Sequence, residues 1–84
     1  MYKIFLNKKS EKALSALMKS RKDIKDKLDR LKENPYKSNG AHPLHGKLKG
    51  KWVCWLGSNI RMIYIIEEEN KIISVDAIGS HNLY

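Results

Sequence analysis

The chain has 84 residues, of which 17 are Lys or Arg and 9 are Asp or Glu, so its formal net charge is +8. This length predicts a single domain over residues 1–84, and the lone cysteine, Cys54, excludes an intramolecular disulfide and favours a reducing compartment. Residues 1–8 lack the apolar run of a signal peptide, and the apolar stretch 62–66 is far shorter than the ~20 residues of a membrane span. We therefore expect a cytoplasmic protein that does not act at a membrane.

Hydrophobic periodicity predicts one strand and two helices in the first part of the chain. Apolar residues alternate over residues 2–6, which is typical of a short strand with one buried face. Ser10 is predicted to be the N-cap of a helix over residues 10–19. A second amphipathic helix over residues 24–31 is expected to end before Pro35, because the residue that precedes a proline avoids helical geometry.

The hydrophobic period changes to two after residue 51. Strands are predicted over residues 52–56, 60–66 and 72–78, and the second of these is apolar on nearly both faces, as a central strand is. The resulting order is β-α-α-β-β-β. It predicts an α+β fold in which a helical hairpin packs on one face of a small, mostly antiparallel sheet.

The positive charge is unevenly distributed along the chain. Residues 1–51 have a net charge of +10, residues 52–84 have a net charge of −2, and residues 34–51 contain no acidic residue at all. A polyanion is the natural partner of such a surface. The alternative is that the lysines of the helices, which alternate with aspartates, only keep a small protein soluble.

The residue types favour proton-transfer chemistry without a metal or cofactor. The histidines and the cysteine lack the paired spacing of a zinc site, and no phosphate-binding glycine loop is present. Histidine can transfer protons near neutral pH, and arginine can hold two phosphate oxygens. The first candidates for these roles are Arg61, which lies inside a predicted strand, and His81, which directly follows the last predicted strand. The alternative for Arg61 is a structural ion pair with Asp76 or the terminal carboxylate. The alternative for His81 is that it is an ordinary surface histidine.

The two tryptophans fall on opposite faces of one predicted strand, so they cannot both lie in the same core. The one outside that core is either a platform on which a nucleic-acid base stacks or a side chain covered by a helix or a partner chain. Tyr84, the last residue, either frays or lies over the sheet beside His81.

The order of elements and three motifs together resemble the RelE/ParE superfamily of toxins over nearly the whole chain. The motifs are a Pro-Leu-x-Gly-x-x-x-Gly loop at residues 43–50, an Arg-x-x-Tyr strand at residues 61–64 and a Gly-x-His ending at residues 79–81. RelE-type members are small ribonucleases that cut messenger RNA in the ribosomal decoding site. The resemblance implies a RelE-like fold, a cognate RelB-like antitoxin, and messenger RNA and the ribosome as further partners.

The resemblance also implies roles for four catalytic residues. Arg61 matches the strand arginine that braces the scissile phosphate, and His81 lies where relatives place an arginine or a histidine that acts as general acid or base. His42 resembles the loop histidine of the YafQ branch. Tyr84 matches the C-terminal aromatic residue that stacks on or orients the substrate.

The chain departs from its relatives on the second predicted strand, over residues 52–56, and in the turn that follows it. RelE carries two lysines where this chain has Trp52 and Cys54, and YafQ-like enzymes carry a histidine and an aspartate where it has Trp55 and Asn59. The expected RNA-binding residues are therefore three loop lysines and one strand tryptophan: Lys47, Lys49, Lys51 and Trp55.

The leading hypothesis is a toxin that is a metal-independent endoribonuclease and uses the 2′-hydroxyl of the RNA as nucleophile. One alternative is a ParE-like poison of DNA gyrase, which has the same fold without the ribonuclease site. The other is a basic RNA-binding module without catalytic activity. The presence of His81 and Tyr84 favours the leading hypothesis over a gyrase poison.

Overall fold

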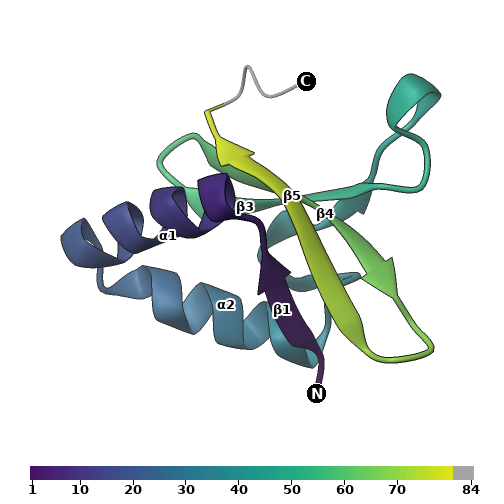
Figure 1. Ribbon diagram of the computed structural model, residues 1–84, viewed down its shortest axis with the longest axis horizontal. Coiled ribbons are helices and arrows are strands. Elements are labelled where there is room, and N and C mark those ends of the chain that lie inside the picture. The colour runs from purple at the N-terminus through teal and green to yellow at the C-terminus, as the bar shows by residue number, and fades with distance from the viewer. Residues whose placement is uncertain (81–84) are drawn as a thin grey trace.

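The computed structural model describes residues 1–80, which form two helices packed on one face of a five-stranded sheet (Figure 1). Strand β1 (Lys3–Leu6) precedes helices α1 (Lys8–Ser20) and α2 (Asp23–Glu33). The short strand β2 (His42–Pro43) follows, and then the long strands β3 (Trp52–Gly57), β4 (Ile60–Glu67) and β5 (Ile72–Gly79). The predicted α+β fold is confirmed. Periodicity missed β2 because two residues carry no pattern.

The strands lie in the order β1-β5-β4-β3-β2, so β4 is the central strand that its apolar residues predicted. Strand β1 pairs parallel with β5, and the other neighbouring pairs are antiparallel. This confirms a mostly antiparallel sheet. Only one residue separates β1 from α1, so the first helix begins beside the sheet. Both helices lie on the same side of the sheet (Figure 1).

The core lies between the helices and one face of the sheet. Buried apolar residues of α1 and α2 meet alternate residues of the three long strands, namely Leu14, Ile24, Leu28 and Leu31 from the helices and Cys54, Leu56, Met62, Tyr64, Ile73 and Val75 from the strands. Tyr64 is fully buried, and its hydroxyl donates to the carbonyl oxygen of Pro35 at 2.7 Å. Burial raises the pKa of the Cys54 thiol to about 12, so it stays protonated and unreactive.

The N-cap of α1 is Asn7, and the prediction of Ser10 is wrong. The helix begins at Lys8, and Asn7 Oδ1 accepts a hydrogen bond from the backbone N–H of Ser10 at 2.8 Å. Ser10 itself lies inside the helix with 2% of its surface exposed. Asn7 Nδ2 also donates to the carbonyl oxygen of Asp76 at 3.1 Å, which ties the start of the helix to β5. Both residue types are good N-caps, and this tertiary contact favours Asn7.

Arg21 joins the turn between the helices to the turn between β3 and β4. Its Nε and Nη2 donate to the carboxylate of Asp23 at 3.2 and 2.6 Å. The guanidinium lies against Gly57, where a Cβ atom would come within 2.3 Å of Arg21 Nη2. Gly57 also has a φ of +87°, a left-handed conformation that favours glycine. Both features require the absence of a side chain at residue 57.

We predict that Gly57→Ala destabilises the protein by at least about 1 kcal/mol more than Gly50→Ala. Gly50 is the matched control, because its φ is +96° but nothing lies within 4 Å of a Cβ atom there. Chemical denaturation measures both losses. In an Arg21→Ala background the obstacle is gone, and the two substitutions should cost the same. Equal losses in the wild-type background would contradict the proposed role of Arg21.

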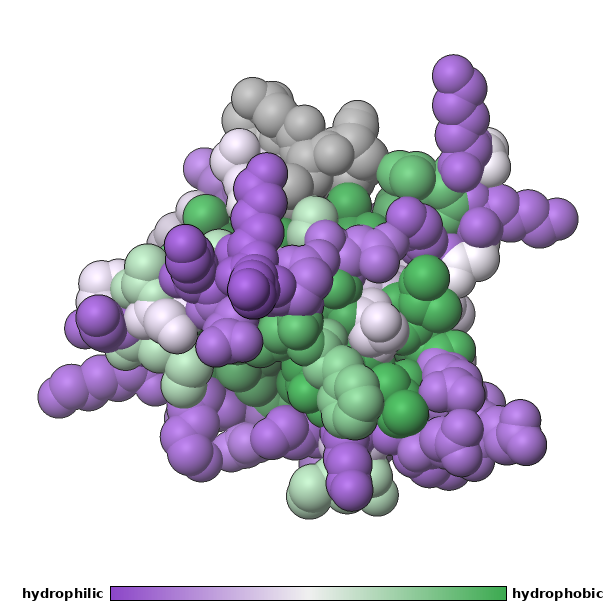
Figure 2. Space-filling view, viewed as in Figure 1, coloured by the Kyte–Doolittle hydropathy of each residue, from purple (hydrophilic) through white to green (hydrophobic). Residues whose placement is uncertain are grey.

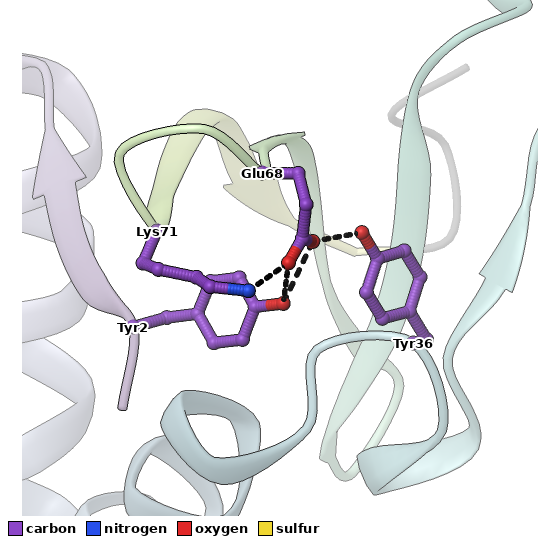
Figure 3. Close-up of polar contacts among 4 residues, drawn as sticks. All are labelled: Tyr2, Tyr36, Glu68 and Lys71. Atoms are coloured by element: carbon purple, nitrogen blue, oxygen red, sulfur yellow. Dashed lines mark hydrogen bonds and ion pairs between the residues drawn. The ribbon is translucent and has the colours of Figure 1, made fainter.

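A cluster of tyrosines around Glu68 holds three distant segments together (Figure 3). Tyr2 Oη donates to the two carboxylate oxygens of Glu68 at 2.9 and 2.7 Å. Tyr36 Oη and Lys71 Nζ donate to the same carboxylate. These donors, Lys71 foremost, lower the pKa of Glu68 to about 2, from an ordinary value of 4.5. The cluster links the residue before β1, the segment after α2 and the turn between β4 and β5.

Glu68 should therefore make folding sensitive to acid. Its pKa is lower in the folded than in the unfolded chain, so its contribution is complete above about pH 4.5 and is lost as the pH falls toward 2. Glu68→Gln should lower stability at pH 7, and its difference from wild type should shrink over that window in denaturation measured at each pH. Glu69→Gln removes the same charge at the next residue. If it reproduced the effect, net charge and not the cluster would be responsible.

Candidate functional site

The face of the sheet opposite the helices carries a small apolar cluster surrounded by charged and aromatic residues. Leu44, Val53 and Ile63 are buried there, and Leu48 packs against them. In Figure 2, where the helices lie at the left, hydrophobic side chains gather in the middle of the view, over the sheet, while hydrophilic side chains project around them. Because successive strand residues point to opposite faces, Trp55 and Arg61 lie on this face, which we call the open face.

Arg61 stacks on Trp55 on the open face. The two residues are opposite one another on β4 and β3, and the guanidinium carbon lies 4.1 Å from the centre of the tryptophan ring. Trp55 is 36% exposed, and it is also packed against Gly40, where a Cβ atom would come within 3.0 Å of the ring. Stacking engages the flat face of the guanidinium, whereas its N–H groups donate within the plane. Trp55 thus orients the guanidinium of Arg61, and the binding of a phosphate by Arg61 stays a prediction.

The predicted opposite placement of the two tryptophans is confirmed, since Trp52 packs against the core under the helices. Trp52 also meets the ring of Tyr36 edge to face, with centroids 5.2 Å apart. The tryptophan that lies outside this core is therefore Trp55. Its role in stacking on RNA stays a prediction.

Asp76, considered above as a partner of Arg61, pairs with Lys51. The distance from Lys51 Nζ to Asp76 Oδ2 is 2.5 Å, and about a third of each side chain is exposed. The register between β4 and β5 shifts here, because Ile63 is opposite Ala77 while Tyr64 is opposite Val75. Asp76 is therefore the extra residue of a β-bulge, a feature that redirects a side chain.

Lys51 and Asp76 lie in an open groove of about 480 Å³ that we call the Lys51–Asp76 groove. The other residues that line it come from the loop before β3 and from β4 and β5, namely His45, Lys47, Leu48, Ile63 and Ala77. Sequence reasoning gave no role to His45, although it lies in the acid-free stretch and inside the Pro-Leu-x-Gly motif. In Figure 1 this teal segment lies at the end of the molecule opposite the helices.

The predicted RNA-binding lysines all belong to this segment. Lys47 is exposed within a short 3₁₀ helix, η2 (Gly46–Leu48), and Lys49 is exposed directly after it. Lys51 differs from them because its charge is balanced locally by Asp76. Lys47 and Lys49 therefore contribute most to the positive potential of the segment.

His42 lies on β2, opposite Val53 of β3. Residues directly opposite one another share a face, so His42 is on the open face with Arg61, and its side chain is exposed. Its Nδ1 lies 3.0 Å from the carbonyl oxygen of Gly40, an arrangement in which Nδ1 carries the proton and donates. Strand spacing places the Cα atoms of His42 and Arg61 roughly 12 Å apart.

The other two predicted catalytic residues, His81 and Tyr84, lie outside the described residues. Their roles stay predictions. Within residues 1–80, no group of three or more His, Cys, Asp or Glu side chains is placed to hold a metal ion. In the same part of the chain, no helix is long and apolar enough to cross a membrane.

Comparison with known proteins agrees with the resemblance seen in the sequence. The family model of the ParE toxins of type II toxin-antitoxin systems (parDE) matches residues 6–82. No curated protein matches the chain. A YoeB/ParE toxin from Agrobacterium tumefaciens has a similar structure, with a TM-score of 0.78 and 18% identity over 94% of this chain and 98% of that chain.

Two further structures are similar over almost their whole length. The conserved hypothetical protein HP0892 from Helicobacter pylori has a TM-score of 0.67 and 29% identity over 98% of this chain and 97% of that one. A structure of the YoeB-YefM complex from Staphylococcus aureus matches with a TM-score of 0.74 and 13% identity, over 96% of this chain and 98% of that one. The fold is therefore that of YoeB-like toxins.

The contact between Arg61 and Trp55 should be measurable as a coupling energy. In a double-mutant cycle of Arg61→Met and Trp55→Leu, we expect a coupling of about 0.5–2 kcal/mol in the free energy of unfolding, the range of cation–π pairs. Pairing Arg61→Met with Trp52→Leu is the control, because Trp52 lies on the opposite face of the sheet. Additive losses in the Trp55 cycle would show that the stacking does not stabilise the fold.

Proposed function

The chain belongs to the ParE toxin family of type II toxin-antitoxin systems, within the RelE/ParE superfamily, and from this premise we propose that it is an endoribonuclease that cleaves messenger RNA at the ribosome. The observation that carries the proposal is the arginine oriented by Trp55 on a sheet face that the helices leave uncovered. The acid-free segment borders the same face and supplies exposed lysines beside it. Such a surface fits a single RNA strand.

In the proposed reaction the RNA supplies its own nucleophile. The 2′-hydroxyl of one nucleotide attacks the adjacent phosphorus, the bond to the 5′-oxygen of the next nucleotide breaks, and a 2′,3′-cyclic phosphate and a 5′-hydroxyl form. One base removes the 2′-hydroxyl proton and one acid protonates the departing 5′-oxygen. Arg61 stabilises the charge that develops on the phosphate oxygens. His42 and His81 transfer the protons, and Tyr84 orients the substrate.

Lys47 and Lys49 hold the RNA by its phosphates. Such contacts raise the rate of encounter with the ribosome and give an affinity that falls with added salt, without sequence preference. The Staphylococcus aureus structure contains YoeB together with YefM. For this chain the corresponding partner is a cognate RelB-like antitoxin, whose acidic segments would complement the net charge of +8.

A second candidate function is poisoning of DNA gyrase. The observation that favours it is the matching family model, which describes the ParE toxins of parDE systems. The two functions differ in their cellular effect. An endoribonuclease stops translation and leaves cut transcripts, whereas a gyrase poison leaves broken DNA.

We expect Arg61→Ala to lower the rate of cleavage of ribosome-bound messenger RNA by about 100-fold or more. His42→Ala and His81→Ala should each lower it by about 100-fold or more, as is usual for the loss of a proton-transfer group. Arg61→Lys keeps the charge but not the paired donors, and it should fall between wild type and Arg61→Ala. Mapping of 5′ ends after brief induction in cells, and cleavage on purified ribosomes, measure these effects.

The matched control is Arg30→Ala, which removes an exposed arginine of α2, on the helix side of the sheet. It should leave cleavage unchanged, and thermal unfolding verifies that all variants fold. Full cleavage by both Arg61→Ala and His81→Ala would overturn the assignment of the site. Gyrase-dependent DNA breaks without cut transcripts would establish the second candidate, and RNA binding with neither effect would indicate a non-catalytic module.

A further inference from the structure

We propose that the Lys51–Asp76 groove binds one nucleotide of the RNA and that Asp76 selects its base, a role that rests on the endoribonuclease function proposed above. The groove combines two kinds of surface. The partly exposed Leu48 and Ala77 offer apolar contact to a flat base, while Lys47 and Lys51 offer positive charge to a phosphate. Its volume of about 480 Å³ lies within the range of small-molecule sites.

The position of the groove fits a nucleotide next to the scissile phosphate. Ile63, in the groove, and Arg61, on the tryptophan, are two residues apart on β4 and point to the same face. Residues so spaced are roughly 7 Å apart along a strand. An RNA strand whose phosphate meets Arg61 can therefore place a neighbouring nucleotide in the groove.

Phosphate binding alone does not explain why Asp76, an acidic residue, lines the groove. A carboxylate repels phosphate, yet the bulge in β5 places one in the groove between cationic side chains. Lys51 contacts Oδ2, and an ionised carboxylate has about four acceptor sites, so acceptor capacity remains. Such a carboxylate can accept a hydrogen bond from an exocyclic amino group, as from N4 of cytosine.

This chemistry predicts which bases the groove prefers. Adenine, cytosine and guanine carry an exocyclic amino group, and uracil does not. Asp76 should therefore favour the first three bases over uracil, while Lys47 and Lys51 bind the phosphate of all four alike. The groove would add a base preference to a surface that otherwise reads only the backbone.

The test is titration of the full chain with the four nucleoside 5′-monophosphates, followed by NMR. We expect the methyl signals of Ile63 and Ala77 to shift, and AMP, CMP and GMP to bind at least about fivefold more tightly than UMP. Asp76→Asn removes the negative charge and replaces one carboxylate oxygen with an amide group that can donate to the carbonyl oxygens of uracil, so the preference should fall below about twofold. Lys47→Gln, which leaves the ion pair of Lys51 with Asp76 in place, should weaken all four nucleotides by a similar factor.

The control is Asp29→Asn, which removes the same charge and breaks a comparable surface ion pair, Lys25 Nζ to Asp29 Oδ2 at 3.0 Å, on α2. It should keep the wild-type preference. Equal affinity for UMP in the wild-type protein, shifts outside the groove, or an unchanged preference in folded Asp76→Asn would each overturn the inference. The comparison of UMP with the other three nucleotides uses only the wild-type protein, so it tests the inference even if Asp76→Asn does not fold.

Failure of this inference is distinguishable from failure of the endoribonuclease proposal. Nucleotide preference is a binding measurement and needs no cleavage. If the wild-type protein cleaves RNA but binds UMP as tightly as the other nucleotides, the base-selecting role is wrong and the ribonuclease function stands. If it shows the preference but leaves transcripts intact, the groove stands as a nucleotide site and the ribonuclease proposal is wrong.

Discussion

The central strand β4 has to satisfy two environments at once, and the rest of the molecule is arranged around this constraint. Met62 and Tyr64 lie fully buried under the helices, while Arg61 and Ile63 point to the open face. Two helices suffice to cover one face of a sheet of this size. The other face is covered in part by the loop that carries Leu44 and Leu48, and the remainder is left for polar and aromatic side chains.

The open face acquires its properties from pairs of residues on different strands. Trp55 of β3 orients Arg61 of β4, and Lys51 before β3 meets Asp76 of β5. Each pair positions a charge that would otherwise be free to sample many rotamers. Preorganised charge is what binding and catalysis on phosphate require, because the protein then does not have to reorganise during the reaction.

The ends of the molecule are held by contacts of a different kind. Glu68 connects Tyr2, Tyr36 and Lys71, and Arg21 presses on the backbone of Gly57. These contacts lie at the edges of the fold, and they brace the turns that flank β4. A small domain has a small core, so such edge contacts carry a larger share of its stability.

The sequence by itself determined the order of the two helices and of every strand except β2, the central place of β4 and the division of Trp52 and Trp55 between the two faces. These features depend on local periodicity, which a chain of 84 residues displays directly. Its motifs also pointed to the toxin superfamily that the family model confirms. The acid-free stretch predicted where positive charge gathers.

Only the tertiary structure decided which side chains contact one another across the fold. Asn7 displaced Ser10 as the N-cap through its bond to Asp76, and the bulge in β5 brought Asp76 to Lys51. His45 joined the groove through the path of a loop that has no period of its own. Periodicity specifies which face a side chain takes, but contacts between distant segments depend on register, bulges and loop closure. Those arise only when the whole sheet is assembled.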